Sequence, residues 1–199
     1  NELKISDELR YNRINALVKK KKIDQAFEVL EEIEKRDEKY YALTGWLYFR
    51  IDEFQKSLDA AEKLYELNPS GKTAFRIAYL NEFHIHNVPK AIEYYKLALE
   101  KKEFAAASRL GDIYFQRNDL QKSLHFHEIA IENGLSKSLL SLSRIFFIEE
   151  DFIAAENYSL KAIDKGFKEA YSTLGLIYQI KKQFKKAENA FKASLANGY

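Results

Sequence analysis

The sequence predicts an all-α solenoid of six helix-turn-helix repeats. In its second half the chain matches itself at a spacing of 32 residues, as Gly134, Gly166 and Gly198 illustrate. Apolar side chains within each unit recur at i, i+3, i+4 and i+7, the spacing of one helix face. Only two prolines and seven glycines occur in 199 residues, so few positions break a helix. A period in this range is typical of stacked two-helix units.

The repeats are expected at residues 7–37, 38–71, 72–103, 104–135, 136–167 and 168–199. Counted from the first residue of each repeat, positions 4, 7, 8 and 11 form the apolar face of the first helix, and positions 17, 20, 24 and 27 that of the second. Small residues at positions 8 and 20, such as Gly111 and Ser123, let two helix axes approach closely. The first repeat departs with Ile14 at position 8, and the third with Tyr79 at position 8 and Glu82 at position 11. We expect local packing to differ there.

Local signals also place the ends of the second helices. Asn87 or Asp119 in the turn can cap the helix that follows it, and Gly134 and its equivalents at position 31 suit the left-handed residue that ends it. No Pro-, Gly- or Ser-rich linker interrupts the series, so residues 1–199 are predicted to form one domain. The chain starts at Asn1 rather than Met, and no polar capping helix follows the last repeat. We therefore expect a piece of a longer protein.

Composition narrows the class of protein. With 32 basic against 30 acidic residues the formal net charge is only +2, so no overall field favours nucleic acid or an anionic membrane. There is no cysteine, which excludes disulfides and thiolate metal sites. No run approaches the roughly 18 to 20 apolar residues of a membrane span, and the first ten residues lack the pattern of a signal peptide. The compartment stays open, cytoplasmic or, if the protein is exported, periplasmic. The frequent Lys, Ile, Asn, Tyr and Phe suggest an AT-rich, bacterial genome.

The sequence contains no pattern that predicts catalysis or a cofactor. The repeat explains all seven glycines, so none is left for a phosphate-cradling loop. Carboxylates such as those of 149–151 lie in turns or on solvent faces, and none has a nucleophile or base at a useful spacing. The lysines of 19–22 lie in the turn of the first repeat, where they give solubility rather than a nucleic-acid site. We predict a protein that is not an enzyme and does not bind nucleic acid.

The four histidines form two pairs, which suggests a metal site, but the spacing within each pair argues against one. His84 and His86, like His125 and His127, are two residues apart. On a helix such neighbours point about 200° apart, so neither pair presents two ligands on one face. His127 also stands at position 24, where other repeats have an aromatic residue. It is expected in the core or at the edge of a groove.

The second repeat carries the clearest family resemblance. Its segment 41–48, followed by Ser57, Ala61, Leu64 and Asn68-Pro69, resembles a tetratricopeptide repeat, with small residues at positions 8 and 20 and proline at 32. The 32-residue units that end in Asn-Gly or Lys-Gly also resemble Sel1-like repeats, although they lack that family's longer loop. The resemblance covers essentially residues 7–199. It implies a right-handed α-α superhelix whose first helices line a concave groove through positions 2, 5, 6, 9, 12 and 13.

Those positions give the candidate partner-binding residues. Position 12 contains phenylalanine in four consecutive repeats, apolar residues at positions 5 and 9 extend that surface, and the remaining groove positions are mostly basic. The phenylalanines either face the groove or pack against their neighbours, and the arginines either bind a partner or pair with local carboxylates. Both alternatives stay open. The candidates are Trp46, Phe49, Arg50, Arg76, Leu80, Phe83, Arg109, Asp112, Phe115, Leu140, Arg144 and Phe147. A basic groove with apolar anchors fits an acidic partner segment.

One known use of such grooves is disfavoured. Some tetratricopeptide proteins clamp the carboxyl end of chaperones with Lys and Asn at set groove positions. Asn15 matches one of these, but Leu43, Thr73 and Ile77 replace the polar and basic residues expected in the next two repeats.

Three function classes follow from this sequence. The first is a scaffold or adaptor that binds another protein in the groove and can also self-associate through its open ends. The second is a peptide sensor that resembles bacterial pheromone receptors, with its effector domain outside these residues. The third, an enzyme, requires a catalytic domain that this segment does not contain.

Overall fold

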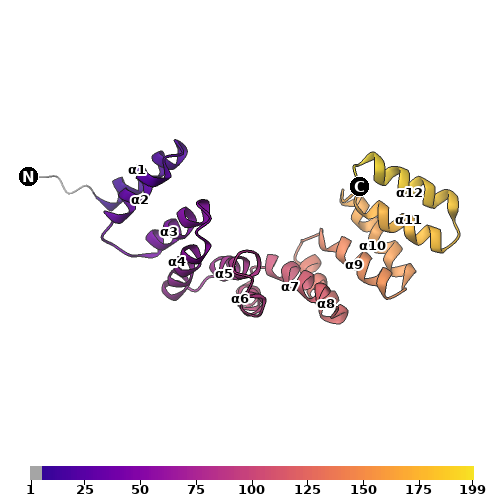
Figure 1. The fold of residues 1–199 in the computed structure, drawn as a ribbon. Coiled ribbons are helices and arrows are strands. Elements are labelled where there is room, and N and C mark those ends of the chain that lie inside the picture. The colour runs from indigo at the N-terminus through magenta and orange to yellow at the C-terminus, as the bar shows by residue number, and fades with distance from the viewer. Residues whose placement is uncertain (1–5) are drawn as a thin grey trace, which may run out of the picture. The chain divides into compact units, whose positions relative to one another are not determined.

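The computed structural model describes residues 6–199, and their regular structure is entirely helical (Figure 1). Twelve helices form six successive antiparallel pairs within these residues, which confirms the predicted all-α class and its helix-turn-helix repeats. None of the described helices is long and apolar enough to cross a membrane. The helices are α1 (Asp7–Lys19), α2 (Ile23–Glu31), α3 (Glu38–Arg50), α4 (Phe54–Leu67), α5 (Gly71–Phe83), α6 (Val88–Glu100), α7 (Ala105–Gln116), α8 (Leu120–Glu132), α9 (Ser138–Ile148), α10 (Phe152–Asp164), α11 (Ala170–Ile180) and α12 (Phe184–Ala196).

Short polar side chains begin several of these helices. The Asp119 carboxylate accepts a hydrogen bond from the Lys122 backbone N–H at 3.2 Å, and Ser70 accepts one from Thr73 at 3.1 Å. Each bond satisfies one of the N–H groups that a helix start leaves without a partner. After α8, Gly134 has a φ of +87°, a conformation that glycine adopts without strain. The predicted caps at Asn87 and Asp119 and the predicted helix end at Gly134 are confirmed, and the cap at Ser70 was not predicted.

The chain divides into two compact units, Asn1–Lys101 with α1 to α6 and Lys102–Tyr199 with α7 to α12. In each unit the core lies between the first and second helix of a pair and between neighbouring pairs. One cluster in the first unit contains Leu58, Ile77 and Leu80. A cluster in the second unit contains Leu139 and Ala162.

Small residues bring the helices of a pair together, as predicted. The hydroxyl of Ser57 donates to the Gly45 carbonyl at 2.7 Å, and that of Ser123 to the Gly111 carbonyl at 2.8 Å. Both bonds join the first helix of a pair to the second through buried groups. They satisfy a hydroxyl that would otherwise be costly to bury.

The third pair differs from the prediction by one residue in its first helix. The buried residues of α5 lie 33 residues before those of α7, whereas Ala91 and Tyr95 of α6 lie 32 residues before their equivalents in α8. The buried residues of α5 are Thr73, Ala74, Ile77, Ala78, Leu80 and Asn81, and those of α7 are Ala106, Ala107, Leu110, Gly111, Ile113 and Tyr114. The turn between α5 and α6 therefore holds one residue more than the turn between α7 and α8.

Backbone hydrogen bonds show the same extra residue. Asn87 N–H donates to the Asn81 carbonyl at 2.7 Å, six residues back, whereas Asp119 N–H donates to Tyr114 at 2.9 Å, five residues back. Gly71 consequently begins α5 rather than ending the second repeat. Ala78, not Tyr79, is the small residue at position 8. The expected packing anomaly at Tyr79 was wrong because it came from counting a fixed repeat length.

Candidate functional site

The predicted groove residues all lie on first helices, but two of them are buried. Leu80 is 0% exposed and Leu140 is 8% exposed. Leu80 points into the core because the shifted register of α5 makes it position 10, and Leu140 packs in a cluster with Ala162 and Ala170. The expectation that these leucines add apolar groove surface was therefore wrong.

The row of four phenylalanines is also changed by the register of α5. Glu82 takes position 12 of the third pair, and Phe83 moves to position 13. Phe49 and Phe147 are half-buried, each edge-on to the phenylalanine that begins the second helix of its own pair, at ring distances of 5.6 Å to Phe54 and 5.7 Å to Phe152. Phe115 is half-buried as well. At position 12 the rings thus contribute both to packing within the pair and to the surface.

On α3, α5, α9 and α11 the exposed large apolar side chains stand at positions 9 and 13, whereas on α1 Leu9 is exposed at position 3. In the first unit Trp46, Tyr79 and Phe83 are 36–40% exposed, and the rings of Tyr79 and Phe83 lie 4.7 Å apart. In the second unit the exposed members are Ile148, Leu176 and Ile180. Sequence reasoning missed Tyr79 because of the register, and it overlooked Ile148 and Ile180 because position 13 was read only for charge.

Arginines of the first unit sit beside this surface. The Arg50 guanidinium lies 5.4 Å from the centre of the Trp46 ring, a cation–π distance. Arg76 is half-buried, with Nη2 3.5 Å from the Ser57 hydroxyl, and burial lowers its pKa. Its Nη2 would lie 3.2 Å from a Cβ added at Gly45, so the glycine leaves room for the guanidinium.

The register of α5 also changes the argument against a chaperone tail. Thr73 and Ile77 are buried, and the groove positions assigned to them belong to Lys72 and Arg76. Two basic residues therefore occupy the positions at which the sequence analysis had placed Thr73 and Ile77. Leu43 in the second repeat still departs from the residues of tail-binding members.

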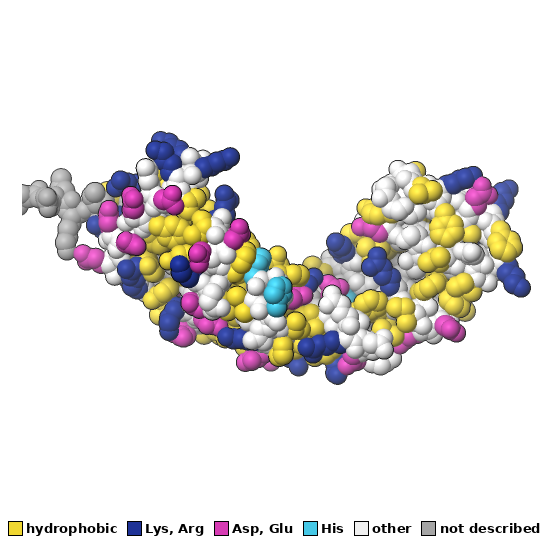
Figure 2. Space-filling view, viewed as in Figure 1, with side chains coloured by type: hydrophobic (Ala, Val, Ile, Leu, Met, Phe, Trp, Pro, Cys, Tyr) yellow, Lys and Arg dark blue, Asp and Glu magenta, His cyan; other side chains and the backbone are white. Residues whose placement is uncertain are grey.

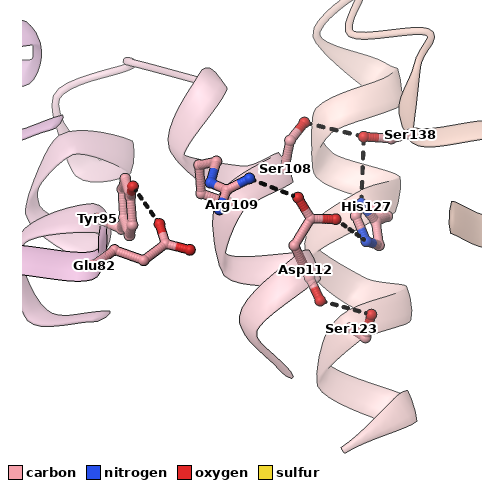
Figure 3. A network of polar contacts seen from close by, with 9 residues as sticks. Glu82, Tyr95, Ser108, Arg109, Asp112, Ser123, His127 and Ser138 are labelled. Atoms are coloured by element: carbon pink, nitrogen blue, oxygen red, sulfur yellow. Dashed lines mark hydrogen bonds and ion pairs between the residues drawn. The ribbon is translucent and has the colours of Figure 1, made fainter. Parts of the chain in front are cut away.

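In the second unit a polar network surrounds His127 of α8 (Figure 3). His127 Nδ1 lies 3.3 Å from the Ser138 hydroxyl, which lies 3.0 Å from the Ser108 hydroxyl. His127 Nε2 lies 3.7 Å from an oxygen of Asp112, and the other carboxylate oxygen of Asp112 pairs with Arg109 at 3.1 Å. Arg109 therefore has a local carboxylate partner, as one of the two sequence alternatives stated. Figure 3 also draws a separate bond of the first unit, from the Tyr95 hydroxyl to Glu82 at 2.7 Å.

The environment of His127 keeps it neutral. The ring is 1% exposed, and burial lowers its pKa to about 4 because a charged imidazole loses its hydration there. Of the two placements expected for this histidine, the core or the edge of a groove, the structure shows a buried ring. A Cβ added at Gly111 would lie 2.7 to 2.8 Å from three atoms of the ring. Because Gly111 has no side chain, the imidazole has room to pack against α7.

The surface around this network carries side chains of both charges, among them Lys137, Arg144 and Glu169. Charged and hydrophobic side chains both reach the surface over α9 to α11 (Figure 2). Helix α9 contacts both α7 and α11, so three first helices form one side of the second unit. A pocket of about 800 Å³ lies elsewhere, between α8, α9 and α10, and is lined both by apolar residues such as Leu142 and by charged ones such as Glu128 and Lys161. It was not predicted from the sequence.

Comparison with known proteins identifies the repeat and the fold. A family model described as tetratricopeptide repeat matches residues 168–196, the last helix pair. The crystal structure of MamA protein is similar at a TM-score of 0.67 and 21% identity, over 80% of this chain and 90% of that one. PilW, described as a widely conserved type IV pilus biogenesis factor, is similar at a TM-score of 0.69 and 11% identity, over 99% and 94% of the two chains.

A third similar structure is the C-terminal part of a TPR repeat-containing protein from Cytophaga hutchinsonii. Its TM-score is 0.76 at 10% identity, over 94% of this chain and 78% of that one. No curated protein matches the sequence. At these identities the likeness shows the tetratricopeptide fold, which is typically non-catalytic. The Sel1-like character of the C-terminal half stays a prediction.

Proposed function

We propose that the chain is a non-catalytic scaffold that binds a segment of another protein along the first helices of its repeats. The observation that carries this proposal is the exposure of large apolar side chains at positions 9 and 13 of the first helices α3, α5, α9 and α11. Grouped apolar surface of this kind is stabilised when a partner covers it. The resemblance to tetratricopeptide proteins, in which the first helices line the binding groove, supports the same assignment.

The side chains suggest the chemistry of the partner segment. In the first unit, Trp46, Tyr79 and Phe83 supply rigid aromatic surface of the kind that carries most of the energy at protein interfaces. Arg50 and, in the second unit, Arg144 add exposed positive charge on the same helices. A segment with aromatic or aliphatic anchors and nearby carboxylates fits both features.

The test is photo-crosslinking from matched positions. A photoreactive phenylalanine analogue at Tyr79 and another at Leu176 place the crosslinker on first helices. Ile153 in α10 is a matched apolar control on a second helix, since it is 80% exposed. After irradiation in an extract of the source organism, mass spectrometry identifies the captured proteins.

We expect the same partner from Tyr79 and Leu176 and none from Ile153. Purified partner should then bind the unsubstituted chain, and Phe83→Ala should weaken binding at least tenfold while it costs less than about 1 kcal/mol in stability. Equal capture from all three positions, or of this chain alone, would mean that the first helices are not the binding surface.

A further inference from the structure

Two neighbouring turns at one edge of the second unit carry opposite charges. The acidic turn, residues 149–151 between α9 and α10, consists of three carboxylate residues. The basic turn, residues 181–186 between α11 and the first turn of α12, contains four lysines. The two turns are adjacent because α11 packs against both α9 and α10, and because Lys181 Nζ lies 2.5 Å from Glu156 Oε2 near the start of α10. Both belong to a single compact unit.

Most of these charges are available to another molecule. The three residues of the acidic turn are exposed, and none of them makes an ion pair with any residue of 6–199. The same holds for Lys182, Lys185 and Lys186 of the basic turn, whereas Lys181 already pairs with Glu156. Three negative charges therefore lie beside three positive charges on one surface.

Helix stability does not account for the basic turn. The N-terminus of a helix favours negative charge, yet Lys185 and Lys186 stand in the first turn of α12. At the start of α10, by contrast, the Asp151 carboxylate accepts a hydrogen bond from the Ala154 backbone N–H at 3.0 Å. No side chain caps α12 in this way. The lysines thus oppose the local preference of the helix that they begin.

Each turn also lies beside one strongly exposed apolar side chain. Ile153 follows the acidic turn and is 80% exposed, and Phe184 of the basic turn is 67% exposed. Phe152, which is the equivalent of Phe184 in the preceding repeat, is half-buried. Hydrophobic and lysine side chains both reach the surface over α11 and α12 (Figure 2). Apolar groups of this size are stabilised when another protein covers them.

This surface is complementary to itself. A two-fold rotation places the acidic turn of one copy on the basic turn of the other, and the reverse contact forms at the same time. Ile153 of each copy then lies next to Phe184 of the other, among the charged groups. A partner of uniform charge would be repelled by one of the two turns, so the charge pattern favours a second copy of the chain.

We propose that the second unit forms a two-fold symmetric dimer with a second copy of this chain through the acidic and basic turns. The contact uses the turns and the starts of second helices, and it leaves positions 9 and 13 of the first helices uncovered. It therefore goes beyond the proposed function and does not depend on it. A dimer carries two copies of the first-helix surface, so a partner with two matching segments is held more tightly than a partner with one.

The first test measures the mass of the whole chain in solution by sedimentation equilibrium over a range of protein concentrations. We expect a monomer–dimer equilibrium that weakens as salt is raised, because the charges are exposed. Glu149→Lys with Glu150→Lys reverses the charge of the acidic turn and keeps Asp151 as the cap of α10. Lys182→Glu with Lys185→Glu reverses the charge of the basic turn. Each of these double variants should dimerise at least tenfold more weakly than the parent chain.

Mixing the two double variants restores both contacts of the two-fold arrangement. The reversed turn of each variant then faces the reversed turn of the other, and the unchanged turns face each other. We expect a dimer that contains one chain of each variant and has an affinity close to that of the parent. Asp52→Lys with Glu53→Lys, in an exposed turn of the first unit, is the matched control and should dimerise like the parent.

The outcomes that contradict the dimer are specific. Circular dichroism first checks that each variant keeps the helix content of the parent. A parent chain that stays monomeric, reversals that leave the dimer unchanged, or a mixture that forms no dimer would each overturn the proposal. Association that continues beyond two chains would overturn it as well, because it indicates stacking through the open ends.

A neutral variant tests the apolar part of the contact and separates this proposal from the scaffold. Ile153→Ser changes an exposed side chain, so the fold should be kept while dimerisation weakens at least fivefold; an unchanged dimer would contradict the assigned contact. A crosslinker at Ile153 should join two copies of this chain, whereas Tyr79 and Leu176 capture the other protein. Partner capture without a dimer would overturn only the present proposal, and a dimer without partner capture would overturn only the scaffold.

Discussion

Replacing Gly111 by alanine tests how tightly α7 packs on α8. The new Cβ would lie 2.7 to 2.8 Å from three ring atoms of His127, distances at which one side must move. The ring is 1% exposed and bonded to Ser138 at 3.3 Å, so it has little space to move into. Overpacking of this kind costs about 1–3 kcal/mol, and alanine returns roughly 1 kcal/mol of helix propensity. We expect a net loss of about 1 kcal/mol in the free energy of unfolding.

A second substitution shows whether the ring is the cause. In a His127→Ala background the obstacle is gone, and Gly111→Ala should gain about 1 kcal/mol from helix propensity alone. The two effects of the same substitution should therefore differ by about 2 kcal/mol, which is the coupling between positions 111 and 127. Gly45→Ala is the matched control. There the nearest atoms are the flexible Arg76 guanidinium at 3.2 Å and the Ser57 carbonyl at 3.3 Å, and we expect a smaller effect.

The measurement is urea denaturation followed by far-ultraviolet circular dichroism. Repeats unfold partly independently. The free energies of unfolding of the variants are therefore compared only where the same signal is followed and the dependence on urea concentration is unchanged. If Gly111→Ala is as stable as the parent chain, or loses the same amount with and without the imidazole, the packing argument is refuted.

Three further predictions follow from burial and capping. His127 has a folded pKa of about 4 and an unfolded pKa near 6.5, so the unfolded chain takes up the proton first as pH falls. The free energy of unfolding should therefore decrease between pH 6.5 and 4, by up to ~1.4 kcal/mol per pH unit. His127→Gln should flatten that slope in equilibrium unfolding. Ser70→Ala removes the cap of α5 and should cost about 1 kcal/mol in urea unfolding, whereas Gln183→Ala at the start of α12, where no side chain caps the helix, should cost much less; equal losses would refute the capping role. Phe49→Ala should cost about 2 kcal/mol because the half-buried ring packs on the phenylalanine that begins α4, whereas Phe83→Ala should cost less than about 1 kcal/mol; equal losses in thermal melts would contradict the assigned exposures.

The helix pairs could be predicted from the sequence because packing and backbone chemistry both repeat there. Gly111 and Ser123 mark the close approach of two helices, and their hydrogen bond is the physical reason that both must be small. Gly134 ends α8 in a left-handed conformation that few other residues adopt without strain. Such local rules leave a signal in a single chain.

The register of α5 could not be predicted in the same way. The helix carries apolar or aromatic residues at nearly every candidate position, so Tyr79 and Ala78 both fit a core pattern. Only the length of the following turn decides between them, and that length appears in the bond from Asn87 to Asn81. The error then placed the buried Leu80 on the groove surface and left the exposed Tyr79 out of it.

The polar network around His127 was missed for a different reason. His127 was expected in the core or at the edge of a groove, but its polar contacts depend on Asp112 and Ser138, which lie on other helices. Spacing along the chain does not predict which side chains of different helices come into contact. Three-dimensional proximity was needed to find a buried imidazole nitrogen without a hydrogen-bond partner.

The extra residue between α5 and α6 separates two kinds of periodicity in this protein. The length of a repeat changes there, while the arrangement of buried residues on each helix stays the same. A gain or loss of one codon in such a turn can thus renumber a whole helix and leave its core untouched. Ancestry among these arrays is better traced by aligning buried positions than by counting residues, and the turn is a natural point at which the gene can change length.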